Sequence, residues 1–205
     1  FKIVSALNDN YVLDLSGGDV RNTSNIQLYK GNGTGSQRWY FGTFEPARQK
    51  LDKMAKQYNA EIEEGTYILS TASDPNYSLD VKYGSTNKGA NVWLYGNNET
   101  TAQQWMLRKD SVGYITFVNV NSNKVLDVSG GKVKNGSNIQ QYDANNTYSQ
   151  KWIAKKNTDG TLTFVSALDY NYVLDISGGK IVNTQNIQLY ESNNSIAQKF
   201  KLTQV

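Results

Sequence analysis

Three residue types able to bind hydroxyl groups recur at constant spacing along the chain. An aspartate is followed after 13 residues by a glutamine, or once by a tryptophan, and after 15 residues by a tyrosine. Carboxylates and amides accept and donate hydrogen bonds to neighbouring hydroxyls, and a ring offers an apolar wall. Residues two apart on a strand point to the same side, so the amide and the ring share one face. This chemistry suits polyols with one partly apolar face, that is, sugars. The four sets are Asp14, Gln27 and Tyr29; Asp80, Trp93 and Tyr95; Asp127, Gln140 and Tyr142; and Asp175, Gln188 and Tyr190.

Each copy also closes on a second glutamine, eight residues after its tyrosine, and on a ring two residues later. No spacing slips by one residue, so the chain consists of four copies of one unit. We expect the closing rings to fill the centre of the fold. The second glutamine, represented by Gln150 and Gln198, is expected to support the aspartate or its turn from behind. The closing pairs are Gln37 and Trp39, Gln103 and Trp105, Gln150 and Trp152, and Gln198 and Phe200.

Composition excludes several kinds of chemistry. The 205 residues contain no Cys and no His, which removes disulfides, thiol catalysis, the usual zinc ligand sets and histidine bases, and no cofactor is expected. The net charge of +3 is spread without a basic stripe, which argues against nucleic acid as a partner. There is no run of eighteen apolar residues, so membrane insertion is not expected.

The distribution of carboxylates argues against an enzyme. A glycosidase needs two carboxylates close together with opposed roles, whereas here the repeat places one aspartate in each copy. We therefore expect no catalysis within these residues, although a longer parent protein could carry a separate catalytic or toxin domain.

The elements that position these residues are expected to be short strands. Each copy offers about four strand candidates separated by Gly and Asn turns; in the first copy they span residues 2–6, 11–15, 26–29 and 38–41. Regular short strands indicate an all-β barrel or β-trefoil built from repeats of ~45 residues. The predicted core of the third and fourth copies comprises Ile115, Phe117, Val125, Leu126, Ile139, Trp152, Phe164, Val173, Leu174, Ile187 and Phe200.

One insertion interrupts the period. The first two aspartates are 66 residues apart, but the later ones are 47 and 48 apart, so about nineteen residues are inserted within residues 45–65. Here the apolar period becomes helical, and we predict a helix over residues 46–63. Its apolar face is more simply explained by packing on a trefoil than by a partner-binding role. That face comprises Leu51, Met54, Ala55, Tyr58 and Ile62.

These features predict three segments. Residues 1–41 form a single repeat, residues 42–64 a helical linker, and residues 65–205 a complete trefoil. The first repeat is most similar to the fourth, which indicates the last third of a preceding, truncated trefoil. One third cannot bury its own apolar face. It must therefore pack on the helix, on the following domain or on repeats of other chains, and an oligomer is one of these alternatives.

The repeated residues resemble a known family. The Leu-Asp-Val/Ile, Ile-Gln-Leu-Tyr and Gln-x-Trp segments, in fixed register, resemble the ricin-type β-trefoil lectins, including bacterial family 13 carbohydrate-binding modules. The resemblance implies a non-catalytic lectin with shallow, multivalent sites. In such lectins the matching aspartate binds a pair of sugar hydroxyls, the strand glutamine is a hydrogen-bond partner and the aromatic residue is the stacking platform.

Two departures from the family pattern matter. In the second copy Trp93 replaces the glutamine, and Lys82-Tyr83-Gly84 replaces Ser-Gly-Gly. Asp80, Trp93 and Tyr95 are therefore a weaker candidate site, which either does not bind sugar or stacks on it differently. The asparagine that family members often carry before Gln-x-Trp is also missing, and its places are taken by Ser36, Ala102, Ser149 and Ala197.

Two alternatives remain open from the sequence. The aspartates could only cap their turns, and the trefoil could be structural or protein-binding with vestigial sugar sites. The expected partners are glycans, either of galactose type or plant or host polysaccharides. A secreted or cell-surface location in a Gram-positive bacterium is expected, because the fold is of a secreted type and has no cysteine.

Overall fold

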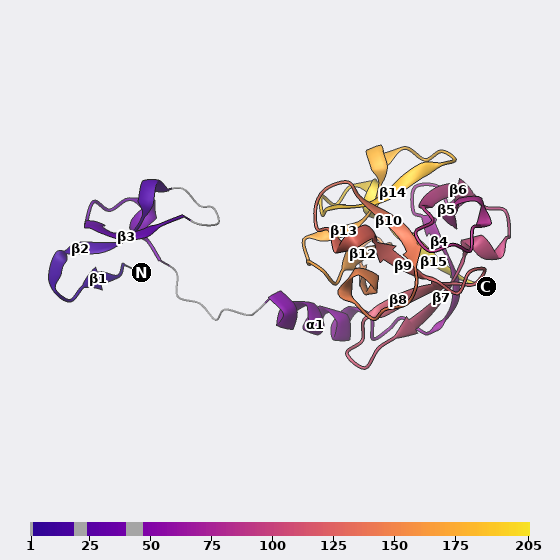
Figure 1. Ribbon diagram of the computed structural model, residues 1–205, viewed down its shortest axis with the longest axis horizontal. Coiled ribbons are helices and arrows are strands. Elements are labelled where there is room, and N and C mark those ends of the chain that lie inside the picture. Colours follow the sequence, from indigo (N-terminus) through magenta and orange to yellow (C-terminus); the bar gives the residue numbers. More distant parts are fainter. Residues whose placement is uncertain (1, 19–23, 40–46) are drawn as a thin grey trace. The chain divides into compact units, whose positions relative to one another are not determined.

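The computed structural model describes residues 2–18, 24–39 and 47–205 (Figure 1). The chain divides into two compact units, Phe1–Glu45 and Pro46–Val205, and each is described by itself. The end of the predicted strand over residues 38–41 and the start of the predicted helix, at Pro46, lie outside the described residues.

The N-terminal unit contains a three-stranded antiparallel sheet in the order β1-β2-β3. Its strands are β1 (Val4–Ser5), β2 (Asn8–Leu15) and β3 (Ile26–Lys30). The predicted fourth strand is wrong where it can be checked, because Arg38 and Trp39 belong to no strand. In the pairing of β2 with β3, Asp14 lies directly opposite Gln27.

The C-terminal unit is an all-β trefoil of three four-stranded repeats, as predicted. Repeat two contains β4 (Gly65–Thr71), β5 (Tyr77–Val81), β6 (Val92–Gly96) and β7 (Gln104–Lys109). Repeat three contains β8 (Ile115–Asn119), β9 (Val125–Val128), β10 (Ser137–Tyr142) and β11 (Trp152–Lys156). Repeat four contains β12 (Leu162–Ser166), β13 (Tyr172–Ile176), β14 (Gln185–Glu191) and β15 (Phe200–Gln204). All twelve strands belong to one sheet, in which β15 pairs with β4 and so joins repeat four to repeat two (Figure 1).

The centre of the trefoil is filled by the closing rings of the repeats. Trp105, Trp152 and Phe200 are completely buried, and every core residue predicted for repeats three and four is at most 2% exposed. The two indole N–H groups donate to backbone carbonyls, of Leu79 at 3.2 Å and of Leu126 at 3.4 Å. The prediction that these rings form the core is confirmed.

Helix α1 (Ala47–Tyr58) packs on the trefoil through the predicted face. Leu51 and Ala55 are buried against a cluster that includes Tyr114 and Ile153. The predicted C-terminal end at residue 63 is wrong, because the helix ends at Tyr58. The reason is the next residue, Asn59, whose side chain leaves solvent and bonds to the trefoil backbone. Its Nδ2 donates to the carbonyl of Gly113 at 2.7 Å, and its Oδ1 accepts from the amide of Ala154 at 2.8 Å.

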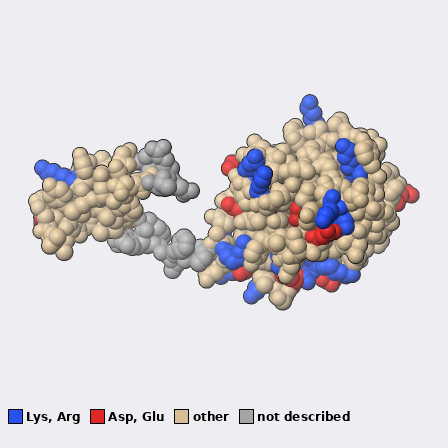
Figure 2. All heavy atoms as spheres, viewed as in Figure 1, with Lys and Arg blue, Asp and Glu red and all other residues tan. Residues whose placement is uncertain are grey.

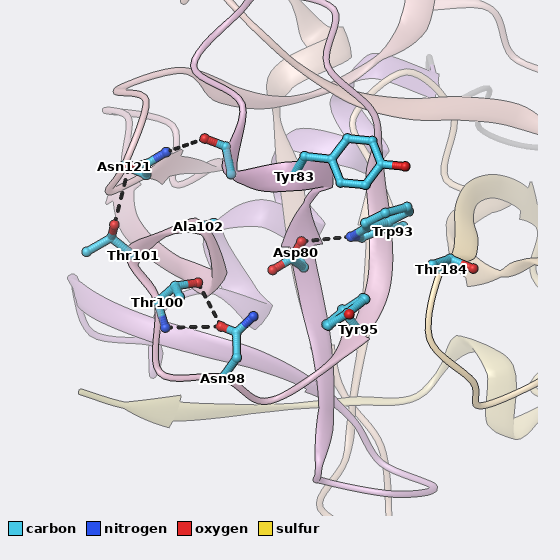
Figure 3. Close-up of a pocket in the computed structure, with 11 residues that line it drawn as sticks. Asp80, Tyr83, Trp93, Tyr95, Asn98, Thr100, Thr101, Ala102, Asn121 and Thr184 are labelled. Atoms are coloured by element: carbon cyan, nitrogen blue, oxygen red, sulfur yellow. Dashed lines mark hydrogen bonds between the residues drawn. The ribbon is translucent and has the colours of Figure 1, made fainter.

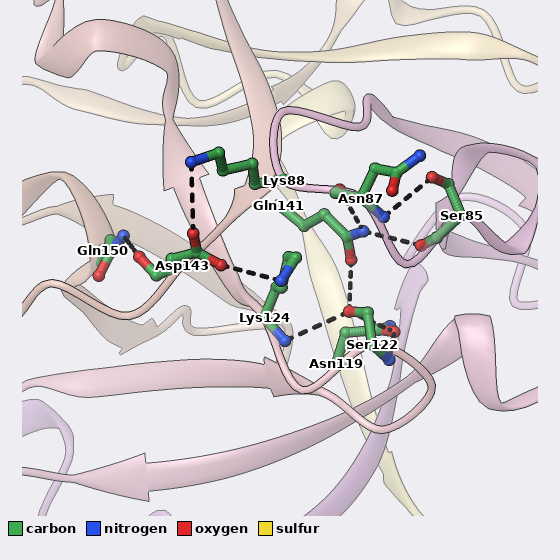
Figure 4. A network of polar contacts seen from close by, with 9 residues as sticks. All are labelled: Ser85, Asn87, Lys88, Asn119, Ser122, Lys124, Gln141, Asp143 and Gln150. Carbon is green, nitrogen blue, oxygen red and sulfur yellow. Dashed lines mark hydrogen bonds and ion pairs between the residues drawn. The ribbon is translucent and has the colours of Figure 1, made fainter.

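One buried polar residue links repeats two and three (Figure 4). Gln141 occupies the position that Leu94 and Leu189 hold in the other two repeats, and all three are completely buried. Its Nε2 donates to the carbonyls of Ser85 at 2.7 Å and Asn87 at 2.9 Å, and its Oε1 accepts from the hydroxyl of Ser122 at 2.6 Å. The amide is therefore fully paired inside the fold, as buried polar groups must be.

Charge distribution and helix length are two further general features of the described residues. Lys and Arg are scattered among Asp and Glu on the face shown in Figure 2. Within the described residues, no helix is long and apolar enough to cross a bilayer.

Candidate functional site

Strand register brings each aspartate against its partner 13 residues later. The second and third strands of each repeat pair the two positions directly, for example Asp127 with Gln140 and Asp175 with Gln188. The amide Nε2 of Gln140 donates to Asp127 Oδ1 at 2.9 Å, and that of Gln188 donates to Asp175 Oδ1 at 2.7 Å. The constant spacing in the sequence therefore reflects a direct side-chain contact.

The second glutamine holds the same carboxylate from the other side. Gln150 Nε2 donates to Asp127 Oδ2 at 3.0 Å, and Gln198 Nε2 donates to Asp175 Oδ2 at 3.1 Å. Gln150 and Gln198 are 2% and 1% exposed, so they contact the carboxylate from inside the protein. A ligand that comes from solvent would meet other residues first. This arrangement matches the supporting role expected for them.

The aspartate is followed by a turn that only glycine adopts easily. In repeat three, Gly130 and Gly131 have φ values of 64° and 62°, in the left-handed region where a Cβ is unfavourable. The turn forms one rim of a hollow of about 490 Å³. The equivalent hollow in repeat four is about 370 Å³. Each contains the predicted carboxylate, amide and tyrosine of its repeat, which are Asp127, Gln140 and Tyr142 in one and Asp175, Gln188 and Tyr190 in the other.

The loop that completes each hollow holds residues that the sequence reasoning missed. Asn145 and Thr147 line the hollow of repeat three, and Asn193 and Ser195 line that of repeat four. Asn145 Oδ1 accepts from the amide and the hydroxyl of Thr147, at 3.1 and 2.8 Å, and so shapes the loop. An available signal was the constant position of these asparagines, three residues after the tyrosine of every copy.

Burial sets the acidity of the candidate carboxylates. The pKa values of Asp80, Asp127 and Asp175 are raised above 3.8, because desolvation outweighs the hydrogen bonds that each accepts. In the N-terminal unit the pKa of Asp14 is lowered, first of all by the hydrogen bond from Gln27. The same sequence pattern thus gives opposite shifts inside and outside a completed trefoil.

Repeat one keeps the first contact of the pattern and has a hydroxyl at the second carboxylate oxygen. Gln27 Nε2 donates to Asp14 Oδ1 at 3.1 Å, and the Ser36 hydroxyl donates to Asp14 Oδ2 at 3.1 Å. Gln37 is buried like Gln150, whereas Tyr29 is 51% exposed.

Repeat two keeps the geometry with different groups (Figure 3). The indole N–H of Trp93 takes the place of the glutamine amide and donates to Asp80 Oδ1 at 2.7 Å. Trp93 stacks on Tyr95 with ring centroids 5.7 Å apart, and Tyr83 meets Trp93 edge-on at 5.2 Å. A hollow of about 480 Å³ opens beside them, so the departures from the pattern have not closed the site.

Known proteins share this fold. A designed threefold-symmetric protein, ThreeFoil, is 28% identical over 69% of this chain and 99% of its own, with a TM-score of 0.66. An exo-β-1,3-galactanase from Clostridium thermocellum is 27% identical, with a TM-score of 0.66; the match covers 70% of this chain but only 31% of the galactanase. A ricin B-like lectin from Macrolepiota procera, solved in complex with lactose, is 17% identical over 71% of this chain and 99% of its own, with a TM-score of 0.61. Because that identity is low, the lectin supports the fold alone.

A search of curated proteins gave no significant match. The model of the family described as ricin-type beta-trefoil lectin domain-like matches residues 49–142 and 101–190, which together span most of the chain. Strand order, core and repeat register agree with that match, and the chain belongs to the ricin-type β-trefoil lectin domain-like family.

Proposed function

We propose that the chain is a non-catalytic carbohydrate-binding module with several shallow sites, one in each repeat that keeps the pattern. The observation that carries this proposal is the hollow of repeat three, where Asp127, Gln140 and Tyr142 come together on one surface. Repeat four repeats the arrangement with Asp175, Gln188 and Tyr190, and repeat one contributes Asp14, Gln27 and Tyr29.

In this mechanism the carboxylate is fixed before the ligand arrives. Two glutamine amides already donate to Asp127, one to each oxygen, so its remaining lone pairs accept from neighbouring sugar hydroxyls without rearrangement. The carbonyl oxygen of Gln140 adds an acceptor, and the ring of Tyr142 supports the C–H face of the sugar. Such an open site holds one sugar at roughly millimolar affinity, about −4 kcal/mol. Several sites together raise the avidity for a polysaccharide by roughly 10²-fold.

The same geometry speaks against catalysis in these residues. The candidate carboxylates belong to separate repeats, and each is held by its own amides instead of facing a second carboxylate across a bond to be cleaved.

We extend the proposal to ligand and setting. The likeness to the exo-β-1,3-galactanase supports β-linked galactosides as first candidates, with plant or host polysaccharides as the natural form. A secreted or cell-surface protein of a Gram-positive bacterium remains the setting that fits a cysteine-free trefoil. Residues 1–41 are proposed to be one third of another trefoil, joined by residues 42–64 to the complete one over residues 65–205.

The test is a titration with galactose, lactose and xylo-oligosaccharides that is monitored by NMR. The signals of each repeat then report binding at that repeat separately. Asp127→Ala with Asp175→Ala should abolish binding at repeats three and four, because both lose the central acceptor. The matched variants Asp127→Asn and Asp175→Asn keep the shape of the side chain and remove only its charge. They therefore control for unfolding caused by truncation of the side chain. Unchanged binding at both repeats in the folded alanine double variant would reject the assigned sites.

A second candidate function is a structural or protein-binding trefoil. It is favoured by Ala102 and Ala197, which line the hollows of repeats two and four and offer no donor where related lectins often carry an asparagine. Absence of binding across a broad glycan array, together with a protein ligand recovered by pull-down, would select this alternative.

A further inference from the structure

Three residues that line the hollow of repeat two differ from their counterparts in the other repeats of the trefoil. Tyr83 stands where the other copies have a glycine, and Trp93 stands where they have a glutamine. The third position, Thr184, comes from the turn before β14 of repeat four, yet it lines the hollow of repeat two (Figure 3). The siblings of Tyr83 are Gly17, Gly130 and Gly178, and those of Thr184 in repeats two and three are Gly89 and Gly136.

Thr184 reaches this hollow through a contact that recurs around the barrel. Its amide donates to the carbonyl of Leu94 in repeat two at 2.9 Å. In the same way, Gly89 of repeat two donates to Gln141 of repeat three, and Gly136 of repeat three donates to Leu189 of repeat four. Each turn therefore lies against the next repeat, but among the hollows of repeats two to four only that of repeat two is lined by such a turn residue, Thr184.

Two of the replacements have an unfavourable backbone. Tyr83 has φ 59° and ψ 22°, and the β-branched Thr184 has φ 69°, in the left-handed region that glycine adopts at the sibling positions. The turn that carries Tyr83 is held by Asn121 of repeat three, whose Nδ2 donates to the carbonyl of Gly84 at 2.8 Å. Strain of this kind persists where the surroundings enforce it and is concentrated at functional sites.

Little burial compensates for the strain at Tyr83. Its side chain is 84% exposed, and its contacts are the edge of Trp93 and the ammonium of Lys82, 5.1 Å from the ring centroid. A residue retained for stability would bury its ring, whereas this ring stands in solvent beside the hollow.

The replacements also change what the hollow can recognise. In repeat three, Gln140 donates to Asp127 and still carries a carbonyl oxygen that can accept from a ligand hydroxyl. In repeat two the single N–H of Trp93 is used by Asp80, and the indole has no acceptor to offer. Compared with repeat three, the hollow of repeat two lacks one oxygen that could accept from a ligand hydroxyl and has apolar ring surface in its place.

We propose that repeat two is a carbohydrate site of different specificity, with Tyr83, Trp93 and Thr184 as its specificity-determining residues. Its ligand is a sugar unit held by Asp80 and by ring contacts, and substituted through a glycosidic bond at the hydroxyl that Gln140 or Gln188 would bind elsewhere. Repeat two therefore binds units linked within a saccharide chain, while repeats three and four accept free monosaccharides. This inference rests on the proposed carbohydrate-binding function and deepens it.

Trp93 makes the test specific to this site. The chain has four tryptophans, Trp39, Trp93, Trp105 and Trp152, and among the hollows of repeats two to four only that of repeat two is lined by one. Titration with galactose and xylose, and then with lactose and xylo-oligosaccharides, is followed by NMR of the Trp93 indole N–H and of the Gln140 and Gln188 side-chain amides. Linked saccharides are expected to bind about tenfold more tightly than the monosaccharides at Trp93, with a smaller difference at the two glutamines.

Tyr83→Gly restores the sibling residue and separates binding from stability. Binding of linked saccharides at Trp93 should fall about tenfold, the order of one lost ring contact, while the melting temperature stays the same or rises because strain is relieved. Thr184→Gly should act in the same direction. Asn123→Gly is the matched control: it removes a left-handed residue, with φ 57°, that lines none of the hollows of repeats two to four, and it should leave binding unchanged.

Three outcomes would overturn the proposal. A Tyr83→Gly variant with a lower melting temperature and unchanged binding would give Tyr83 a structural role. A Trp93 signal that no saccharide moves, while Gln140 and Gln188 respond, would show that repeat two is not a site. Absence of any response at all three residues would reject the proposed function and this inference together.

Discussion

At the residue scale, each candidate site depends on a carboxylate that is nearly removed from water yet still faces a hollow. Asp80, Asp127 and Asp175 are 4–5% exposed, and each accepts a hydrogen bond from the residue opposite it in its hairpin. Burial raises the pKa of all three, whereas hydrogen bonds stabilise their charged forms. If these carboxylates bind sugar as proposed, their protonation links sugar binding to pH.

We predict that sugar binding weakens at mildly acidic pH. A ligand hydroxyl needs the ionised carboxylate as acceptor, and a raised pKa means that the proton is bound at a pH above the ordinary value of 3.8. Stability responds with the opposite sign. A pKa raised in the folded state means that the folded protein binds protons more readily than the unfolded chain, so these groups favour folding more as pH falls through the raised values.

The measurement is affinity and urea stability across a series from about pH 7 to pH 4. Affinity that stays constant down to the ordinary aspartate pKa would contradict the prediction. Asp127→Asn is the control for repeat three, because it cannot ionise and should remove the pH dependence of any residual binding there.

A second prediction concerns Gln141, which stands where repeats two and four have a buried leucine. Gln141→Leu should destabilise the fold by about 2–4 kcal/mol, although leucine is the sibling residue. The reason is that the carbonyls of Ser85 and Asn87 and the hydroxyl of Ser122 each lose a hydrogen bond to the Gln141 amide (Figure 4). Urea unfolding measures the change, with the exposed Gln204→Leu as control. A Gln141→Leu variant as stable as the parent would show that water replaces the amide.

At the element scale, α1 is attached to the trefoil by an apolar stripe, by polar contacts of its own side chains and by the residue that follows it. Leu51 and Ala55 bury the stripe, and Asp52 accepts a hydrogen bond from the Tyr114 hydroxyl at 2.7 Å. Asn59 follows the helix and bonds to three backbone groups of the barrel. The helix thus belongs to the C-terminal unit, and the tertiary contact of Asn59 determines where it stops.

Asn59→Ala is expected to cost about 2–4 kcal/mol and to loosen α1. The substitution leaves the carbonyl of Gly113 and the amide of Ala154 without a partner in a buried place. Amide hydrogen exchange along residues 47–58 and urea unfolding measure the two effects. Lys56→Ala, at an exposed position of the same helix, should change stability by less than about 0.5 kcal/mol. Equal exchange rates in both variants would mean that the contacts of α1 itself hold the helix without Asn59.

At the scale of the whole molecule, the N-terminal unit has an apolar face that its counterpart in the trefoil does not expose. Ile26 and Leu28 are 50% and 56% exposed, whereas the equivalent Ile187 and Leu189 of repeat four are completely buried by the neighbouring repeats. This difference supports the proposal that residues 1–41 are one third of a trefoil that needs two further repeats.

We predict that the 205-residue chain self-associates through this face, since further copies of the same repeat could supply the missing thirds. Sedimentation at increasing concentration should show oligomers, and Leu28→Lys should shift the chain towards monomer. Lys30→Ala, an exposed change at the end of the same strand, is the control. A monomeric parent chain at all concentrations would show that repeats of other chains do not cover this face.

The sequence by itself determined the fold class, the core and the pairs of residues at each site. The repetition made this possible, because four copies in one register show which spacings are constant. The constant spacing of 13 residues corresponds to two positions that face each other across a hairpin, as Asp127 and Gln140 do. The apolar period likewise identified the buried face of α1. These properties are local or periodic, and they follow from backbone geometry.

Only the tertiary structure decided what depends on neighbours from other repeats. The sequence pattern made repeat two the weakest candidate, but the folded chain places Thr184 of repeat four beside Tyr83 and Trp93 and keeps the hollow open. The end of α1 at Tyr58 and the pairing of Gln141 also depend on distant backbone groups. The physical reason is the same in each case: a buried or strained group is stable only with its partners, and here these lie far away in the sequence.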